Sequence, residues 1–148
     1  MAIYQGAAVP SPDTGGQPFN YFVHIVNLAD EYIDFYQPQA YNNWYDGLPG
    51  GSLDYFKDVY LNWRNLQGLS PWGKPLPNFA GIKAEKLRIG LLASRQAGGA
   101  AYYGEPGVIE QFKGFLKTNK YALNGFMIWD SHWDALNSFA ISQVCATA

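Results

Sequence analysis

Residues 37–44 read Gln-Pro-Gln-Ala-Tyr-Asn-Asn-Trp and close a segment, 32–41, that is rich in aromatic and β-branched residues. This composition predicts a strand, and the polar residues that follow predict a long loop at its carboxyl end. Because side chains two apart on a strand point the same way, Gln39 and Tyr41 should project together, with Asn42 opening the loop. The carboxyl ends of strands are where α/β folds place their functional sites.

The rest of the chain repeats a strand followed by a helix. Short apolar segments predict strands, and apolar residues spaced three and four apart predict amphipathic helices. The predicted strands are 2–9, 32–41, 86–94 and 123–129, and the predicted helices are 21–31, 52–66, 106–116 and 135–144. Alternating strands and helices favour a parallel sheet covered by helices, and strands without strict polar alternation suit a sheet buried on both faces.

The number of repeats favours half of a (β/α)8 TIM barrel, since a complete barrel typically needs about 250 residues. An open doubly wound sheet that binds a nucleotide is disfavoured, because no glycine-rich fingerprint follows the first strand and no P-loop motif is present. The whole chain, residues 1–148, is therefore predicted to be one α/β domain of four sequential βα units, with no separate second domain.

Composition excludes several classes of partner. The formal charge is −2, from 10 basic and 12 acidic side chains, and it offers no electrostatic basis for binding nucleic acid or an anionic membrane. No apolar run reaches the roughly 18 residues of a membrane span, and the first residues lack the basic start of a signal peptide. One cysteine and two histidines argue against a disulfide and a zinc cluster. Aromatic residues make up 17% of the chain and either fill the core or stack on sugar rings.

Two further stretches carry polar or aromatic groups at a predicted strand end. Residues 125–134, Gly-Phe-Met-Ile-Trp-Asp-Ser-His-Trp-Asp, predict a strand that ends on a tryptophan and is followed by carboxylates and an imidazole. Residues 89–102 combine an apolar strand with a loop of small residues and a tyrosine. Together with residues 37–44, these stretches make the chain resemble the family 18 chitinases (glycoside hydrolase family 18), whose catalytic domain is a (β/α)8 barrel.

The resemblance follows three motifs in their order along that barrel. The Gln-x-Tyr-Asn of its sixth strand matches Gln39, Tyr41 and Asn42, and its seventh-strand Gly-Leu-Pro-Ala segment with a later tyrosine matches residues 90–102. Its eighth-strand Gly-x-Met-x-Trp-Ser-x-x-Trp-Asp matches residues 125–134, with an aspartate in place of the serine. The chain thus looks like strands five to eight, the carboxyl-terminal half of the barrel.

The resemblance also implies a chitin or chito-oligosaccharide substrate, an extracellular location, and a site without metal or cofactor. In that family the N-acetyl carbonyl of the sugar attacks the anomeric carbon and forms an oxazolinium. By resemblance, Tyr41 would hydrogen-bond this acetamide, and Trp129 would form the floor of the same subsite. The other candidate substrate-binding residues are Gln39, Asn42, Trp44 and Trp133. Each of these four has a structural alternative, because the tryptophans could anchor loops and the amides could satisfy backbone groups. His132 is expected at the surface or behind the site residues, in preference to a role as metal ligand or in a charge relay.

The sequence departs from the family at the general acid. The signature Asp-Gly-x-Asp-x-Asp-x-Glu of the fourth strand has no counterpart, and none of the four glutamates, Glu31, Glu85, Glu105 and Glu110, follows a predicted strand directly. The isolated chain is therefore predicted to be inactive as a chitinase.

Three interpretations remain open at this point. The chain is a fragment or split partner of a chitin-hydrolysing enzyme, a stand-alone chito-oligosaccharide binder without catalysis, or an assembly domain that keeps the barrel motifs for packing. A half-barrel leaves the edges of its first and last strands unpaired. The expected partner is therefore the missing amino-terminal half-barrel, a second copy of this chain, or a larger assembly.

Overall fold

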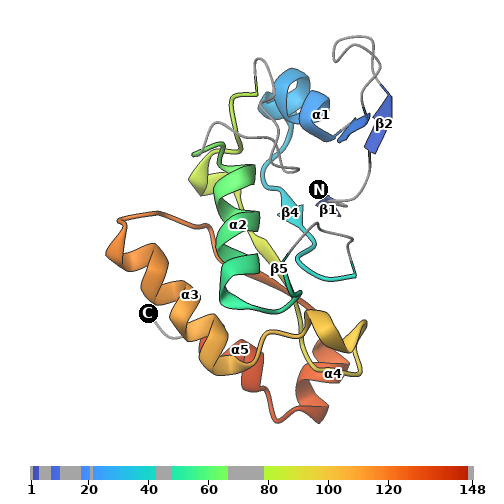
Figure 1. Ribbon diagram of the computed structural model, residues 1–148, viewed down its shortest axis with the longest axis vertical. Helices are drawn as coiled ribbons and strands as arrows, with labels where there is room; N and C mark the ends of the chain where they lie inside the picture. The colour runs from blue at the N-terminus through green and yellow to red at the C-terminus, as the bar shows by residue number, and fades with distance from the viewer. Residues whose placement is uncertain are drawn as a thin grey trace.

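The computed structural model describes residues 22–42, 48–66 and 79–146, and the backbone of three short strands that precede them (Figure 1). Its helices are α1 (Phe22–Ala29), α2 (Leu53–Trp63), α3 (Pro106–Thr118), α4 (Ser131–Leu136) and α5 (Ala140–Ala146). Its strands are β1 (Ala2–Ile3), β2 (Ala8–Pro10), β3 (Pro18–Asn20), β4 (Gln37–Pro38), β5 (Ile89–Leu92) and β6 (Phe126–Trp129). Short 3-10 turns cover Asp30–Tyr32, Ala84–Lys86 and Ala100–Tyr102. The candidate residue Trp44 lies outside the described residues.

Parallel pairing relates the strands in the order β1, β4, β5, β6. β1 pairs with β4, and β5 pairs with β6. Two isolated parallel bridges, Tyr36 to Leu87 and Gln39 to Gly90, connect β4 to β5. The predicted α/β class is confirmed. The contact between β4 and β5 is not a continuous ladder, so the division into four βα units stays a prediction.

The first predicted strand, 2–9, is wrong in its extent. It is divided into β1 and β2, and β2 pairs antiparallel with β3, with Val9 opposite Phe19. The sequence between β2 and β3, Ser-Pro-Asp-Thr-Gly-Gly-Gln, is composed mainly of turn formers, which permit a reversal of the chain. This added hairpin is why the amino-terminal part departs from a simple strand-and-helix alternation.

Helix α2 agrees closely with its prediction. The side chain of Ser52 accepts a hydrogen bond from the backbone N–H of Tyr55 at 3.2 Å, which caps the helix at its amino terminus. The helix has a stripe of apolar residues spaced three and four apart, and this stripe is buried throughout; it consists of Tyr55, Phe56, Val59, Tyr60 and Trp63. The spacing of apolar residues was sufficient to predict this helix, because one face of the helix packs against a single continuous core.

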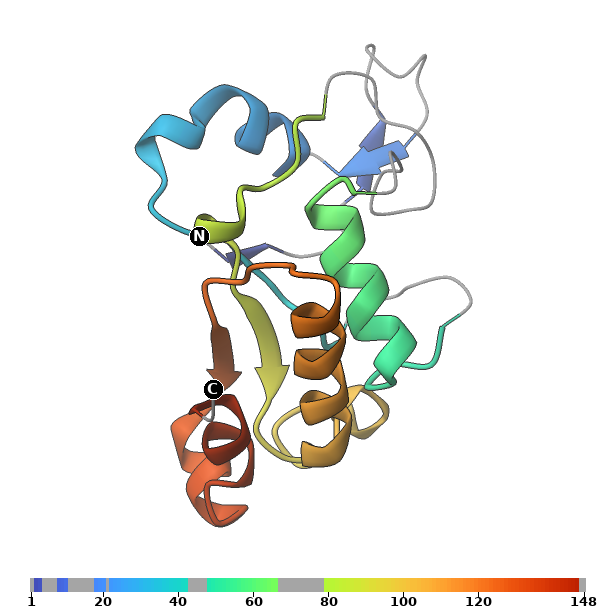
Figure 2. The same ribbon diagram turned by 90° about the vertical axis from the view of Figure 1, so that its left-hand side faces the viewer.

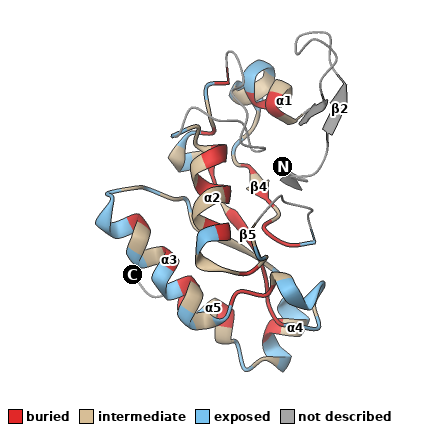
Figure 3. Cartoon of the chain, viewed as in Figure 1, coloured by how far each residue is buried: buried red, intermediate tan, exposed pale blue. Residues whose placement is uncertain are grey.

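Helices α2 and α3 lie on the same side of β5 and β6 (Figure 2). The ring of Phe112 on α3 meets that of Phe126 on β6 edge to face, with 6.3 Å between centroids. The same ring lies 6.1 Å from that of Phe56 on α2. All four residues of β5 are buried, and Figure 3 shows buried residues concentrated on β5 and α2. Both helices therefore pack against one side of these strands.

The last strand, β6, is less buried than predicted. Its first three residues are half-buried, and Trp129 is 50% exposed. Among the described strands, β6 pairs only with β5, so no further strand covers its outer edge. The prediction that this strand is buried is wrong for this reason.

The last predicted helix, 135–144, is two helices. Ser138 and Phe139 have φ angles of +56° and +58°, which interrupt the helix between α4 and α5. The buried carboxylate of Asp134 accepts a hydrogen bond from the backbone N–H of Ile141 at 3.2 Å and ties the two helices together. Within the described ranges, no helix has both the length and the apolar character to cross a membrane.

Candidate functional site

The strand register aligns the candidate residues in two rows across β4, β5 and β6. Gln39 is opposite Gly90, and Gly90 is opposite Met127. Two residues further along, Leu92 is opposite Trp129, and Tyr41 follows Gln39 by two residues. Residues opposite one another in parallel strands share a face, and neighbouring strands lie about 4.8 Å apart.

Because Gly90 has no side chain, the side chain of Met127 has room to lie over it on this face. A Cβ atom at Gly90 would lie 3.0 Å from Cε of Met127 and 3.0 Å from the carbonyl oxygen of Pro38. The methionine side chain therefore lies over the glycine. This contact confirms that Met127 faces the same side as the position of a Gly90 side chain, away from Phe126 and the helices.

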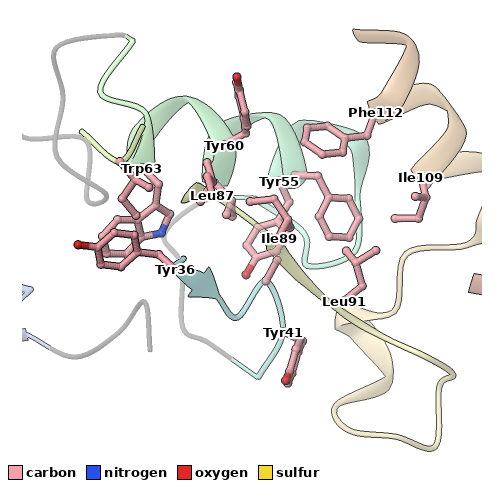
Figure 4. Packing of buried hydrophobic residues seen from close by; sticks show 14 of the residues in the cluster. Tyr36, Tyr41, Tyr55, Tyr60, Trp63, Leu87, Ile89, Leu91, Ile109 and Phe112 are labelled. Atoms are coloured by element: carbon pink, nitrogen blue, oxygen red, sulfur yellow. The ribbon is translucent and has the colours of Figure 1, made fainter. Parts of the chain in front are cut away.

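Tyr41 is almost fully buried, with 3% of its surface exposed, at the carboxyl end of β4. Its phenolic oxygen accepts a hydrogen bond from Nε2 of Gln39 at 3.4 Å, so these two side chains do project together as predicted. Burial raises the pKa of Tyr41, and the hydrogen bond from Gln39 offsets part of that rise. The hydroxyl is therefore neutral at physiological pH and can donate its hydrogen. Figure 4 shows the Tyr41 ring apart from the side chains packed beneath α2.

Asn42 holds the loop that follows β5. Its Oδ1 accepts a hydrogen bond from the backbone N–H of Gly99 at 2.6 Å. A Cβ at Gly98 would lie 2.9 Å from Nδ2 of Asn42, so the loop approaches this side chain as closely as a glycine permits. Asn42 has a φ of +53°, a left-handed conformation that asparagine tolerates better than most residues. The structural alternative for Asn42 is thus observed, and its contact with substrate stays a prediction.

Trp129 ends β6 with half of its side chain exposed. Its carbonyl oxygen accepts a hydrogen bond from the backbone N–H of Ala93 at 2.9 Å, which joins the carboxyl ends of β5 and β6. The peptide bond to Asp130 is cis. Asp130 then caps α4 by accepting a hydrogen bond from the backbone N–H of Trp133 at 3.2 Å. The indole of Trp129 therefore lies at the end of a strand whose outer edge no described strand covers.

Trp133 lines a pocket beyond the carboxyl ends of β5 and β6. The pocket has a volume of about 300 Å³ and is lined by Ser94, Gln96, Trp133, Leu136 and Asn137. The exposed ring of His132 contacts that of Trp133 edge to face, at 5.3 Å between centroids, which agrees with the expected surface position of this histidine. Sequence analysis singled out Trp133 but missed the other lining residues, since loop and helix residues distant in sequence carry no shared pattern.

Asn137 is a second residue that sequence analysis missed. Its Nδ2 donates hydrogen bonds to the carbonyl oxygen of Ala93 at 2.9 Å and to the hydroxyl of Tyr103 at 3.0 Å. Burial raises the pKa of Tyr103, which keeps this hydroxyl neutral. The asparagine side chain therefore links α4 to the segment after β5 and forms one wall of the pocket.

None of the four glutamates lies beside the two rows. Glu31, Glu85, Glu105 and Glu110 are all exposed, and Glu105 pairs with Arg95. Asp54 and Asp58 lie on α2, where the first pairs with Lys57 and the second accepts a hydrogen bond from Asn62 at 3.0 Å. Within the described ranges no three histidine, cysteine or acidic side chains are grouped so as to hold a metal ion.

Sequence comparison finds no relative: no family model matches the chain, and no curated protein matches it. Comparison of the fold finds similar solved structures. A family GH18 chitinase from Chromobacterium violaceum has a TM-score of 0.72 at 18% identity, over 99% of this chain and 43% of its own. A candidate chitinase A from Streptomyces coelicolor has a TM-score of 0.65 at 23% identity, over 98% and 48% of the two chains. This chain has a chitinase-like fold.

A third solved structure agrees. A GH18 chitinase from Pseudoalteromonas aurantia has a TM-score of 0.58 at 20% identity, over 97% of this chain and 44% of its own. The chitinase-like chain thus spans about half the length of the solved chitinases that it matches. The predicted resemblance is confirmed at the level of the fold, and the partial coverage agrees with a match to part of a barrel.

Proposed function

We propose that this chain is the carboxyl-terminal part of a chitinase-like glycoside hydrolase domain and that it binds N-acetylglucosamine units of chitin at the carboxyl ends of β4, β5 and β6. The observation that carries the proposal is the shared face of Gln39, Tyr41 and Trp129 across these strands. An amide, a phenolic donor and a half-exposed indole suit a neutral sugar, because an indole stacks on the apolar face of a sugar ring while the polar groups bind its substituents.

Tyr41 is the group proposed to contact the reacting acetamide. Since Gln39 donates to its oxygen, the phenolic hydrogen is left for an acceptor on the sugar. A donor fixed at this place stabilises the charge that develops while the acetamide carbonyl attacks the anomeric carbon with retention of configuration. Asn42, Trp44 and Trp133 are proposed to bind neighbouring parts of the oligosaccharide.

The proton for the leaving oxygen is proposed to come from another part of a complete barrel. The chain's glutamates are exposed, and none of them lies at the carboxyl end of a described strand. General acid catalysis contributes a factor of about 10² to 10⁴. The isolated chain is therefore expected to bind chito-oligosaccharide without hydrolysing it.

The proposed partner is the missing half-barrel or a second copy of this chain. The outer edge of β6 is uncovered among the described strands, and an uncovered edge favours association. The matched chitinases are about twice as long as this chain, which supports the first partner. An extracellular location belongs to the same proposal.

A second function is a non-catalytic chito-oligosaccharide binder or assembly domain. The observation in its favour is that none of the chain's glutamates lies at the carboxyl end of a described strand. The two functions differ in one result, because only the first predicts hydrolysis once an amino-terminal half with the acid motif is supplied.

Titration calorimetry of the full chain with chitotriose tests the binding proposal. We expect Trp129→Ala to weaken binding by about tenfold or less, since aromatic contacts contribute about 0.5–1.5 kcal/mol. Tyr32→Ala is the matched control, because Tyr32 is also an exposed aromatic, at 81%, and follows α1 away from the two rows. Equal binding by the Trp129 variant and the parent chain would contradict the proposal.

A further inference from the structure

The chain contains one asparagine that is followed directly by a glycine, and this pair, Asn124–Gly125, leads into β6. The side-chain amide of an asparagine can react with the backbone nitrogen of the next residue, and a glycine there has no Cβ to hinder the approach. Pairing of β6 with β5 begins at the residue that follows the pair. Figure 2 shows these two strands side by side, so a change in the covalent structure of the pair acts on the sheet.

The structure leaves both reacting groups accessible. Asn124 is exposed. Among the hydrogen bonds of the described residues, none uses the backbone N–H of Gly125, so this nitrogen gives up no such partner when it reacts. A Cβ atom placed on Gly125 would have no atom of the described residues within 4 Å, which leaves room beside the pair for a five-membered ring.

The chain on either side of this peptide bond is held to the neighbouring strand. The N–H of Asn124 donates to the carbonyl oxygen of Leu87 at 3.0 Å, and the carbonyl oxygen of Gly125 accepts from the following strand. The donor to Gly125 is the N–H of Ile89, at 3.2 Å. Nδ2 of Asn124 donates to the carbonyl oxygen of Glu85, in the 3-10 turn that precedes β5. The side chain of Asn124 thus ties the start of β5 to the start of β6.

We propose that Asn124–Gly125 is a deamidation site, at which water converts the asparagine to aspartate or isoaspartate and loosens the pairing of β5 with β6. The nitrogen of Gly125 loses its proton and attacks Cγ of Asn124. A C–N bond forms, the bond from Cγ to Nδ2 breaks, and the amide leaves as ammonia. Water then opens the succinimide ring at either of its carbonyl carbons, so the reaction consumes one water, releases one ammonia and needs no oxidant.

Either product removes the bond to Glu85. A carboxylate has no hydrogen to donate to the carbonyl oxygen of Glu85, and it places a negative charge against that oxygen. Isoaspartate also adds one atom to the main chain between the bonds to Leu87 and Ile89, so these two bonds cannot both keep their geometry. Trp129 pairs with Leu92 further along the same ladder, and we expect deamidation to disturb its position too.

Mass spectrometry of the full chain, stored in mildly alkaline buffer and then digested with trypsin, tests the modification. We expect peptide 121–148 to gain about 1 Da with time, and its fragment ions to locate the gain at residue 124. Asn119 is the matched control, because it is also exposed and its Nδ2 also donates to a backbone carbonyl, that of Phe115, at 2.8 Å.

Lys120 follows this control residue, and its Cβ hinders the attack, so Asn119 should convert at least about tenfold more slowly than Asn124. Equal conversion of the two asparagines, or an unchanged residue 124 in the stored chain, would overturn the proposal.

Hydrogen exchange of backbone amides, followed by nuclear magnetic resonance, tests the effect on the sheet. In Asn124→Asp, which carries the aspartate product in every molecule, the N–H groups of residues 89 and 124 should exchange about fivefold faster than in the parent chain, the effect of one lost hydrogen bond. The N–H of Phe56, bonded to the carbonyl oxygen of Ser52 at 3.1 Å on α2, should keep its rate.

Gln111→Glu controls for charge alone, since it adds the same negative charge at an exposed position on α3 and should leave all three rates unchanged. Parent-like exchange at residues 89 and 124 of the Asn124→Asp variant would show that the bond to Glu85 does not hold the strands together. An equal rise at residue 56 would show a general loss of stability. Either result contradicts the proposed effect on the sheet.

Discussion

The side-chain amide of Gln39 donates a hydrogen bond to the phenolic oxygen of Tyr41, 3.4 Å away. The bond joins two residues on one face of one strand end, where Tyr41 is buried and Gln39 is partly exposed. The bond orients the phenol and uses only its oxygen. The proposed role of Tyr41 as a donor to the sugar rests on the phenolic hydrogen that remains.

Removing that hydroxyl should affect turnover once the barrel is complete. With an amino-terminal half bearing the acid motif supplied in trans or by fusion, Tyr41→Phe should lower kcat by about 10²-fold, since one donor to a developing charge is lost. Asp54→Asn, at an exposed ion pair on α2, should leave kcat unchanged. Release of a fluorogenic group from a chitobioside measures both. Strong activity of the isolated 148 residues would contradict the account of the missing acid.

Two replacements of Asn42 should differ in stability. Asn42→Gly loses the side-chain bond to Gly99 but keeps the left-handed conformation easily, whereas Asn42→Ala loses the bond and also strains the backbone. We expect the alanine variant to be less stable than the glycine variant by about 1 kcal/mol. Urea unfolding followed by circular dichroism measures the difference. Equal stability of the two variants would show that the backbone conformation is not the determining factor.

Phe112 should be the most costly aromatic to truncate on α3. Its buried ring contacts Phe56, Tyr60 and Phe126, which join α3 to α2 and β6. Phe112→Ala should reduce the free energy of unfolding by about 3–5 kcal/mol. Phe139→Ala removes a ring that is 53% exposed and should cost far less. Chemical denaturation compares the two, and a similar loss for both would contradict the placement of the core.

Stability should fall at alkaline pH. Burial raises the pKa of Cys145 from 9.0 to about 12 and that of Tyr36 from 10.0 to about 12. In each case the folded chain holds the proton more tightly than the unfolded chain does. The resulting stability is fully present below the unfolded pKa values, which are 9.0 and 10.0, and is lost as the pH rises toward 12.

The urea midpoint measured from pH 8 to 11 checks this dependence. In Cys145→Ala, the decline should begin about one pH unit later, when the tyrosines begin to ionise. The same onset in the variant and the parent chain would contradict the assignment to Cys145.

Local patterns in the sequence were sufficient for the elements whose formation depends on near neighbours. The serine cap and apolar stripe of α2 are examples, because a helix brings residues three and four apart onto one face. The joint projection of Gln39 and Tyr41 follows in the same way from the two-residue period of a strand. The motifs around these residues also indicated the chitinase-like fold that the solved structures share.

Contacts between distant segments depend on tertiary packing. The spacing of apolar residues within one helix or strand does not predict them. Trp129 is half-exposed because β6 has no described neighbour on its outer side, although its apolar sequence predicts burial. Asn137 gains its role only when α4 brings it to Ala93 and Tyr103, 44 and 34 residues away in the chain. Asn42 likewise meets the loop after β5 across 57 residues. The sequence alone determines which side chains have suitable chemistry and how they are spaced within one element. Only packing between distant segments determines which of these side chains contact one another and which remain exposed to a ligand.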